Sequence, residues 1–253
     1  MFSGDRKFPF QKKIQPFYLL LTLYKETEYG SDMDYDKMVL RPLDPLAEDF
    51  RKGIKIYEER FEDSMRLSSE AIVRALQKTD GDIQLYSYGF YYQEQIIGFC
   101  LLTLYKKEDF VYVSYIALSS EISDYNTGRL FMENIAEVSK QLTDSFLLFE
   151  VEQGDILERL YRLWGIGMLH YHHVMPVFDM TLERVLARVM IYPKIKSIDK
   201  EQYLKCLSAF LNYEYSEGIS ATLSSEDAIK YREYIAKIYE DIKKSLPDTI
   251  NVK

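Results

Sequence analysis

The sequence predicts a mixed α/β protein, in which a central sheet is flanked by helices on both faces and a helical appendage follows at the C-terminus. Apolar segments typical of strands succeed one another through the middle of the chain, with helical patterns before, between and after them. Over residues 195–253 the apolar residues recur at helical spacing instead. The chain has 253 residues, of which 47% are hydrophobic, so it can bury a large core.

Three parts are expected along the chain. Residues 1–37 form an N-terminal extension, 38–194 the α/β domain and 195–253 the helical C-terminal extension. The first part contains an apolar stretch at 14–24 that is too short to span a bilayer. No small-residue cleavage pattern follows this stretch, so we expect a packed strand or helix there rather than a signal peptide.

The spacing of apolar residues predicts the helices and strands of the α/β domain, and Pro and Gly mark where they end. Pro42 and Pro45 close the first strand, and Gly81 ends a short helix that begins at a Ser cap. The expected order is a strand at 38–43, a helix at 46–62, a helix within 67–81, a hairpin of strands at 83–93 and 95–106, a strand at 110–118, a helix at 127–142, a strand at 145–152, a helix at 155–164, and strands at 169–178 and 182–193. The C-terminal extension is expected to hold two helices, at 197–213 and 224–246.

Charge and cysteine content limit the classes of function. The formal net charge is -8 and no Lys/Arg-rich run stands out, so nucleic acid and an anionic membrane surface are poor partners. A basic ligand such as an amine suits this field better. Cys100 and Cys206 have neither the number nor the spacing of a disulfide framework or a zinc site, which favours a reducing, cytoplasmic location.

The segment 115–135 runs from an apolar strand through a polar loop into a helix, with Gly128 at the helix entrance. The first turn of a helix leaves backbone N–H groups unpaired, and a diphosphate can accept hydrogen bonds from them. Asp124 adds unhelpful negative charge, which Arg129 offsets only if it points back to the loop. The alternative is an ordinary turn, with Asp124, Asn126 or Thr127 as its cap.

Two motifs resemble those of the GNAT superfamily of N-acetyltransferases over residues 38–193. "YNTGRL" at 125–130 stands where that family has its diphosphate loop, although Tyr125 and Leu130 depart from the usual residues. "RLYRLWGI" at 159–166 resembles the end of a later helix in the family. The resemblance implies a GNAT-like fold that binds acetyl-coenzyme A (acetyl-CoA) at a splayed pair of central strands.

The resemblance also implies roles for particular residues. The backbone of the strand before the loop would hold the carbonyl and the pantetheine arm, and Tyr161 would protonate the departing sulfur. Packing is the alternative for Tyr161, which is one of 22 tyrosines. The implied cofactor-binding residues are Ile116, Ala117, Leu118, Tyr125, Asn126, Thr127, Gly128, Arg129 and Leu130.

Two glutamates are candidates for the group that takes the proton of the amine. Glu150 and Glu152 alternate along one strand and share a face, where they could accept a proton or bind a cationic substrate. The alternative is two solvated charges at a strand end. His170, His172 and His173 lack a third ligand type nearby, so no metal site is expected and packing or lining the acceptor groove is favoured.

The expected function is therefore transfer of an acetyl group from acetyl-CoA to an amine by direct attack, without a covalent enzyme intermediate. The acceptor is a small-molecule or peptide amine. Two alternatives stay open: an inactive GNAT-like binding or regulatory module, and an acyltransferase with another acyl donor. The tail helices are expected to cover the sheet, to form a contact in a homodimer or to wall the acceptor site.

Overall fold

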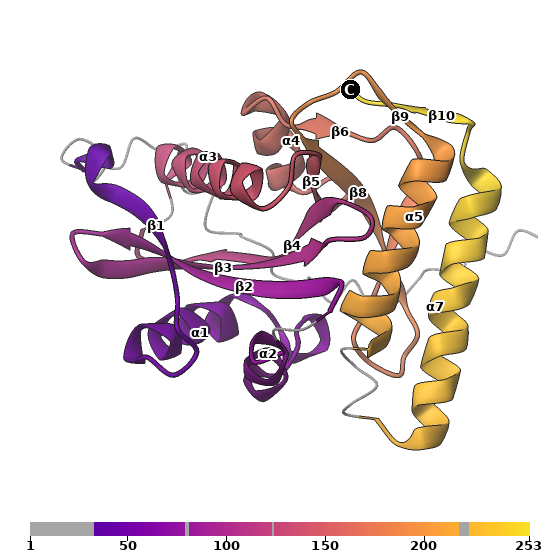
Figure 1. Cartoon of the computed structure of the whole chain (residues 1–253), viewed down its shortest axis with the longest axis horizontal. Coiled ribbons are helices and arrows are strands. Elements are labelled where there is room, and N and C mark those ends of the chain that lie inside the picture. Colours follow the sequence, from indigo (N-terminus) through magenta and orange to yellow (C-terminus); the bar gives the residue numbers. More distant parts are fainter. Residues whose placement is uncertain (1–32, 79–80, 123, 218–222) are drawn as a thin grey trace, which may run out of the picture.

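The computed structural model describes residues 33–78, 81–122, 124–217 and 223–253, so the apolar stretch at 14–24 lies outside the described residues. A sheet of eight strands, in the order β1-β2-β3-β4-β5-β8-β6 with β7 also paired to β8, forms the centre of the molecule (Figure 1). Its strands are β1 Met38–Pro42, β2 Ile83–Tyr92, β3 Gln95–Tyr105, β4 Phe110–Leu118, β5 Phe146–Glu152, β6 Gly167–Met168, β7 His173–Pro176 and β8 Arg184–Tyr192.

The neighbouring strands β4 and β5 are parallel, whereas the other paired strands of this sheet are antiparallel. They pair only from Phe110 to Tyr112. Just beyond, the register of β4 against β3 passes from Val113 to Tyr115 and skips Ser114, which marks a β-bulge. A bulge bends its strand and increases the local twist, so β4 turns away from β5 and the two strands diverge.

Helices cover both faces of this sheet, as the sequence predicted (Figure 1). On one face α1 Glu48–Arg60 and α2 Ser69–Leu76 bury a cluster that includes Tyr57 and Phe99. On the other, α3 Tyr125–Leu142 and α4 Ile156–Leu163 bury a second cluster, in which the rings of Phe90 and Phe131 stack at 4.5 Å. None of the helices in the described ranges has the length and apolarity needed to cross a membrane.

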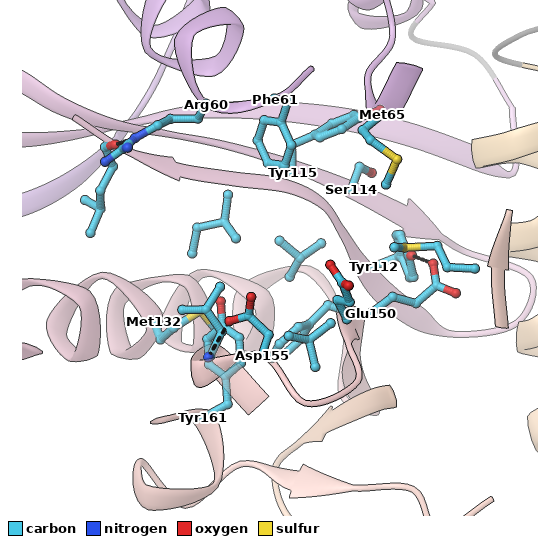
Figure 2. A pocket seen from close by; sticks show the side chains of 18 of the residues that line it. Arg60, Phe61, Met65, Tyr112, Ser114, Tyr115, Met132, Glu150, Asp155 and Tyr161 are labelled. Atoms are coloured by element: carbon cyan, nitrogen blue, oxygen red, sulfur yellow. Dashed lines mark hydrogen bonds between the residues drawn. The ribbon is translucent and has the colours of Figure 1, made fainter. Parts of the chain in front are cut away.

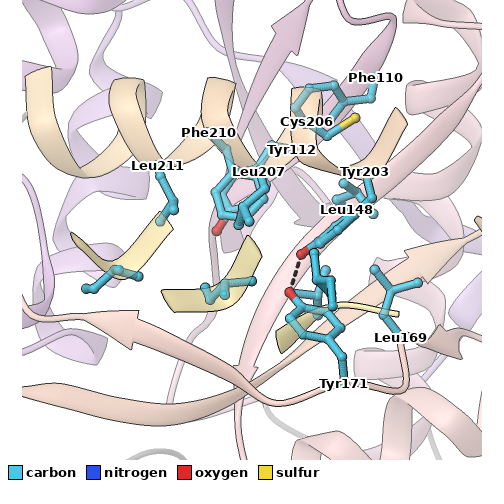
Figure 3. Packing of buried hydrophobic residues seen from close by; sticks show 14 of the residues in the cluster. Phe110, Tyr112, Leu148, Leu169, Tyr171, Tyr203, Cys206, Leu207, Phe210 and Leu211 are labelled. Atoms are coloured by element: carbon cyan, nitrogen blue, oxygen red, sulfur yellow. Dashed lines mark hydrogen bonds between the residues drawn. The ribbon is translucent and has the colours of Figure 1, made fainter. Parts of the chain in front are cut away.

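The C-terminal extension packs against the part of the sheet that β4, β5 and β8 form (Figure 1). It comprises β9 Ser197–Asp199, α5 Lys200–Phe210, a π-helical turn η4 Leu211–Glu217, α7 Ser225–Ser245 and β10 Thr249–Asn251. Figure 3 shows α5 residues such as Phe210 against strand residues such as Tyr112, whose rings stack at 4.9 Å. The extension and the sheet therefore share one hydrophobic cluster.

Two expectations about element boundaries are wrong. The single strand expected at 169–178 is split, because Leu169 bridges Val252 and the amide of His170 donates to the carbonyl of Asn251. The C-terminal end of the chain thus takes backbone groups that a longer strand would have used. The helix expected from 197 begins only at Lys200, because residues 197–199 form β9 and pair with β10.

Candidate functional site

A cavity of about 240 Å³ occupies the gap where β4 and β5 diverge. Residues of both strands line it, together with residues of α3, α4, the connection between α1 and α2, and the C-terminal extension. Figure 2 shows Arg60 at one end of this cavity and Tyr112 with Glu150 at the other. A concave, mostly apolar site with a few polar groups is typical of small-molecule binding.

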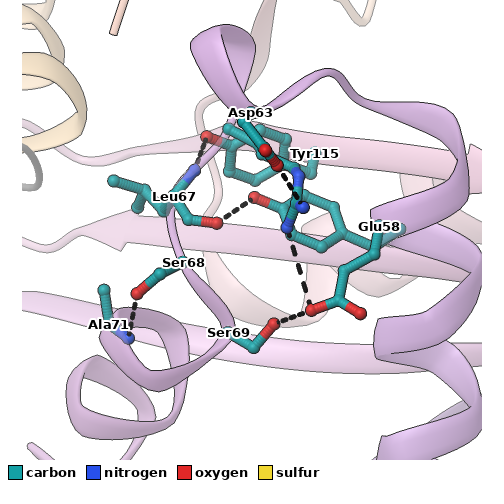
Figure 4. Close-up of polar contacts among 9 residues, drawn as sticks. Glu58, Asp63, Leu67, Ser68, Ser69, Ala71 and Tyr115 are labelled. Carbon is teal, nitrogen blue, oxygen red and sulfur yellow. Dashed lines mark hydrogen bonds and ion pairs between the residues drawn. The ribbon is translucent and has the colours of Figure 1, made fainter. Parts of the chain in front are cut away.

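The connection between α1 and α2 is fixed over the cavity by two tyrosines (Figure 4). The hydroxyl of Tyr57 donates to the carbonyl of Leu67 at 2.9 Å, and the amide of Leu67 donates to the hydroxyl of Tyr115 at 3.1 Å. Phe61 and Met65 of this connection line the cavity. The hydrogen bond between Leu67 and Tyr115 thus ties the connection between α1 and α2 to β4, just beyond the bulge.

The backbone of β4 presents polar groups to the cavity. The amide of Ser119 donates to the carbonyl of Ile97 at 2.8 Å, and an antiparallel ladder uses alternate residues. Ala117 therefore bonds toward β3, while Ile116 and Leu118 direct their backbone groups to the side of β5. Ile116 and Leu118 line the cavity, whereas Ala117 is buried against β3.

Asp124 is an ordinary cap at the N-terminal end of α3. Its carboxylate accepts from the amides of Asn126 at 2.9 Å and Thr127 at 3.1 Å, and its carbonyl accepts from the amide of Gly128 at 3.0 Å. The structure thus has the cap that the sequence offered as the alternative, and the Gly128 amide makes the first helical hydrogen bond of α3. Tyr35 also donates to this carboxylate at 3.3 Å, so the carboxylate occupies the place that a diphosphate oxygen would take.

The remaining residues of the motif have structural partners as well. A Cβ on Gly128 would lie 3.2 Å from the Trp164 ring, so the glycine makes room for an indole. The Tyr125 ring packs edge-on against the same indole at 5.7 Å. Arg129 pairs with Glu133 at 3.0 Å rather than with the loop, and Leu130 packs against the hydrophobic cluster beneath α3.

Tyr161 is positioned on α4 by a well-formed helix end. Gly165 has a φ of +82°, and the amide of Ile166 donates to the carbonyl of Tyr161 at 3.0 Å, which is the pattern of a Schellman cap. Tyr161 is buried, lines the cavity, and its hydroxyl has no hydrogen-bond partner among the described residues. Burial raises the pKa of Tyr161, so the phenol stays neutral at physiological pH.

Glu150 belongs to a buried hydrogen-bond network and is not a solvated charge. Its carboxylate accepts from the hydroxyls of Tyr112 at 2.6 Å and Tyr215 at 2.5 Å, and it pairs with Nε2 of His173. The Nδ1 atom of His173 lies 2.8 Å from the hydroxyl of Tyr171. Three partners on one carboxylate fit a group that holds the wall of the cavity together, rather than one that exchanges protons with a substrate.

Glu152 stands differently from Glu150, although both belong to β5. It lines the cavity at half-burial and makes no side-chain hydrogen bond to any described residue. Burial, and to a smaller extent the charge of Asp155, raises the pKa of Glu152. Of the two glutamates of β5, Glu152 is the one whose environment suits a proton acceptor.

Sequence reasoning missed a further buried glutamate in the cavity, Glu214 of η4. It is buried, lines the cavity and accepts from the hydroxyl of Tyr105 at 2.9 Å. Burial raises the pKa of Glu214 to about 7. No local signal marks this residue, because its burial depends on how the C-terminal extension packs on the sheet.

The three histidines and two cysteines lie in different environments. His170 and His172 are exposed, and His173 is buried in the network around Glu150. Cys100 and Cys206 are free and buried. Within the described ranges, no three His, Cys, Asp or Glu side chains come together in a way that could hold a metal ion.

Comparison of the fold with solved structures gives a consistent answer. No protein-family model matches the sequence, and no curated protein matches it. A protein assigned to the GNAT family of acetyltransferases, from Bacteroides thetaiotaomicron, superposes with a TM-score of 0.58 at 14% identity, over 70% of this chain and 97% of that one. The chain therefore has the GNAT fold, as its two motifs predicted.

Two further solved structures are similar over slightly less of the chain. An N-acetyltransferase from Staphylococcus aureus Mu50 has a TM-score of 0.49 at 15% identity, over 61% of this chain and 96% of that one. The spermidine/spermine N-acetyltransferase of Vibrio cholerae has a TM-score of 0.48 at 14% identity, over 62% and 92% of the two chains.

Proposed function

We propose that this protein is an acetyl-CoA-dependent N-acetyltransferase that transfers an acetyl group to an amine by direct attack. The observation that carries this proposal is the cavity between the diverging strands β4 and β5. It brings together backbone groups of β4 that face β5, a neutral phenol with no hydrogen-bond partner among the described residues, and carboxylates of raised pKa. Acyl transfer to an amine needs donors for the carbonyl, an acid for the sulfur and a base for the amine.

Each of these needs has a residue in the cavity. The backbone groups of Ile116 and Leu118 face the gap, where they can hold the carbonyl and the pantetheine arm of the donor. Glu152 takes the proton that the amine loses before it attacks. Tyr161 gives its proton to the sulfur, because a neutral phenol can donate to a thiolate as it forms.

The diphosphate end fits acetyl-CoA less well, since the Asp124 carboxylate already accepts from two of the amides in question. Binding by this route requires the carboxylate to leave the helix end and the diphosphate to replace it. Arg60 lines the cavity and donates to the carbonyl of Leu118 at 2.7 Å, so a cation stands near this end. Its charge favours a polyanionic donor.

Thermal unfolding with and without acetyl-CoA tests the proposal. At about 100 times its dissociation constant the ligand is expected to raise the free energy of unfolding by about 2.7 kcal/mol, because it binds only the folded state. Dephosphorylated and truncated donors, such as acetyl-pantetheine, serve as controls for the role of the diphosphate. The absence of a shift with any CoA thioester at millimolar concentration would contradict the proposal.

Asp124→Asn gives a sharper test of the diphosphate end. Asparagine caps a helix about as well as aspartate, so α3 should keep its start while the competing negative charge is lost. We expect acetyl-CoA affinity to rise severalfold, since removing one like charge close to a phosphate is worth on the order of 1 kcal/mol. Calorimetric titration measures this, with exposed Asp63→Asn as the matched control. Unchanged affinity would show that the diphosphate does not approach this helix end.

A second function has one observation in its favour. The Asp124 cap fills the amides that a diphosphate would need, which is what a GNAT-shaped binding or regulatory module without catalysis would show. Another acyl donor that lacks this diphosphate contact, such as an acyl carrier protein, fits the same observation. A cytoplasmic location and a homodimer remain part of the proposal.

A further inference from the structure

The C-terminal extension supplies one wall of the cavity. Glu214 and Tyr215 of η4 both line it, and both hydrogen-bond to residues of β4 or β5. Glu214 accepts from the hydroxyl of Tyr105 of β3 at 2.9 Å. The hydroxyls of Thr103 of β3 and of Ser114, the residue skipped at the bulge of β4, also hydrogen-bond to it. The bulge of β4, beside which the cavity opens, is therefore also where the Glu214 carboxylate of the C-terminal extension contacts the sheet.

Acidic residues outnumber basic ones in the described lining of the cavity, which favours a cationic ligand. Arg60 is the one basic residue among the described lining residues, and it stands at the end opposite Tyr112 and Glu150 (Figure 2). Charged carboxylates buried without a counter-ion are costly, and a cationic ligand removes that cost. The acidic lining residues are Glu62, Asp124, Glu150, Glu152, Asp155 and Glu214.

The same end of the cavity is aromatic. Tyr112, Phe178 and Tyr215 line it, and the rings of Phe178 and Tyr215 stack at 5.0 Å. Aromatic faces attract ammonium groups and also pack against apolar chains. Buried Tyr161 lines the same cavity, and its hydroxyl has no hydrogen-bond partner in the described part of the chain, which is a second sign that a ligand completes the cavity.

We propose that Glu214, carried by the C-terminal extension, is the counter-ion that receives the ammonium group of an amine acceptor with an apolar or aromatic stem. This inference rests on the proposed function and deepens it, since it names the class of acceptor and the residue that selects it. Glu214 acts here as a binding and positioning residue, and the proton transfer stays with Glu152. The site as a whole is then built from both the α/β domain and the C-terminal extension.

The inference requires a characteristic pH dependence. An ammonium group binds the carboxylate form, and the pKa of Glu214 in the free protein is about 7, so acceptor affinity should fall as the pH drops below 7 and level off above it. The titratable groups that interact with Glu214 are Tyr105 of β3, through a hydrogen bond, and Tyr112 and Tyr115 of β4 and Glu150 of β5, through their charges. Tyr112 and Tyr115 stay neutral through this range, because burial raises their pKa values.

Glu214→Gln tests the inference, with 2-phenylethylamine as the probe and 2-phenylethanol as its neutral isostere. Binding is measured by calorimetry on the full chain without acetyl-CoA, from pH 6 to pH 9. We expect the variant to bind the amine about ten- to a hundredfold more weakly and to lose the pH dependence, while weak binding of the alcohol is unchanged. Glu201→Gln removes the same charge from an exposed position on α5 and should leave amine binding as it is.

The outcome separates this inference from the proposed function. Equal amine affinity in wild type and Glu214→Gln, at every pH, would overturn the inference even if acetyl-CoA binds and acetyl transfer occurs. A Glu214-dependent affinity for the amine would support it even if acetyl-CoA fails to bind.

The melting temperature and the acetyl-CoA shift of Glu214→Gln report whether the variant is folded. If it is not, Glu214→Asp keeps the charge on a shorter side chain and should weaken amine binding while retaining the pH dependence, whereas unchanged affinity would again overturn the inference.

Discussion

Replacing Tyr161 by Phe is expected to lower turnover with acetyl-CoA by about a hundredfold or more, because general acid catalysis contributes about 10² to 10⁴ in rate. The ring remains, so its edge contacts with Phe149 at 4.8 Å and Trp164 at 5.5 Å are kept. The hydroxyl has no partner among the described residues, so its loss leaves no protein donor or acceptor unpaired. The free energy of unfolding and the affinity for acetyl-CoA should therefore stay nearly constant.

Steady-state kinetics with saturating amine, together with a binding titration, separates the two effects. A fall in kcat at constant affinity is the expected result, since the proton is needed only as the sulfur leaves. Tyr239→Phe, on a surface of α7 away from the cavity, serves as the matched control. If turnover is the same in Tyr161→Phe and wild type, the phenol is a packing residue and the sulfur leaves by another route.

Replacing Glu150 by Leu is expected to lower the free energy of unfolding by about 3–5 kcal/mol, the usual cost of removing one partner of a buried charged network. The hydroxyls of Tyr112 and Tyr215 and the imidazole of His173 would lose their common partner inside the core. Because Tyr215 comes from the C-terminal extension, the change should also loosen the contact between η4 and the sheet.

Urea unfolding followed by tryptophan fluorescence and circular dichroism measures this loss. Glu150→Gln is the informative control, because it keeps an acceptor oxygen while removing the charge, and we expect a smaller loss. An exposed glutamate on the same extension, Glu233→Leu, should change stability by less than about 0.5 kcal/mol. A Glu150→Leu variant within about 1 kcal/mol of wild type would show that the network contributes little.

The sequence was sufficient for the layers of the fold, because apolar periodicity and caps act over a few residues. The helix α4 Ile156–Leu163 and its cap Asp155 could be read from the local pattern, and the structure has both. The divergence of β4 and β5 entered only through the resemblance to a known family. Its cause, the bulge at Ser114, could not be predicted, because a single serine in a nearly continuous apolar run does not by itself indicate a shift of register.

The site could be predicted only in part, because several of its residues are fixed by contacts distant in sequence. Gly128 reads as a phosphate-binding glycine, yet Trp164 lies against it. Glu150 reads as a solvated charge or a base, yet three donors from β4, β7 and η4 surround it. Glu214 carries no local signal at all, since only the packing of the C-terminal extension buries it.

Asp124 shows how one residue can support two opposite interpretations. As a sequence feature it marks a helix start, which is the place where anions bind. As a side chain it supplies the anion itself and accepts from the amides of Asn126 and Thr127. Whether acetyl-CoA displaces this carboxylate separates the proposed acetyltransferase from its two alternatives, a binding module and an acyltransferase with another donor.

A crystal structure of the full chain with coenzyme A bound is the most direct test of this claim. We predict that the sulfur lies between β4 and β5 within hydrogen-bonding distance of the Tyr161 hydroxyl, and that the diphosphate has replaced the Asp124 carboxylate on the amides of Asn126 and Thr127. Coenzyme A outside this gap, or an unoccupied gap at millimolar ligand with Asp124 still capping α3, would contradict the proposed acetyltransferase.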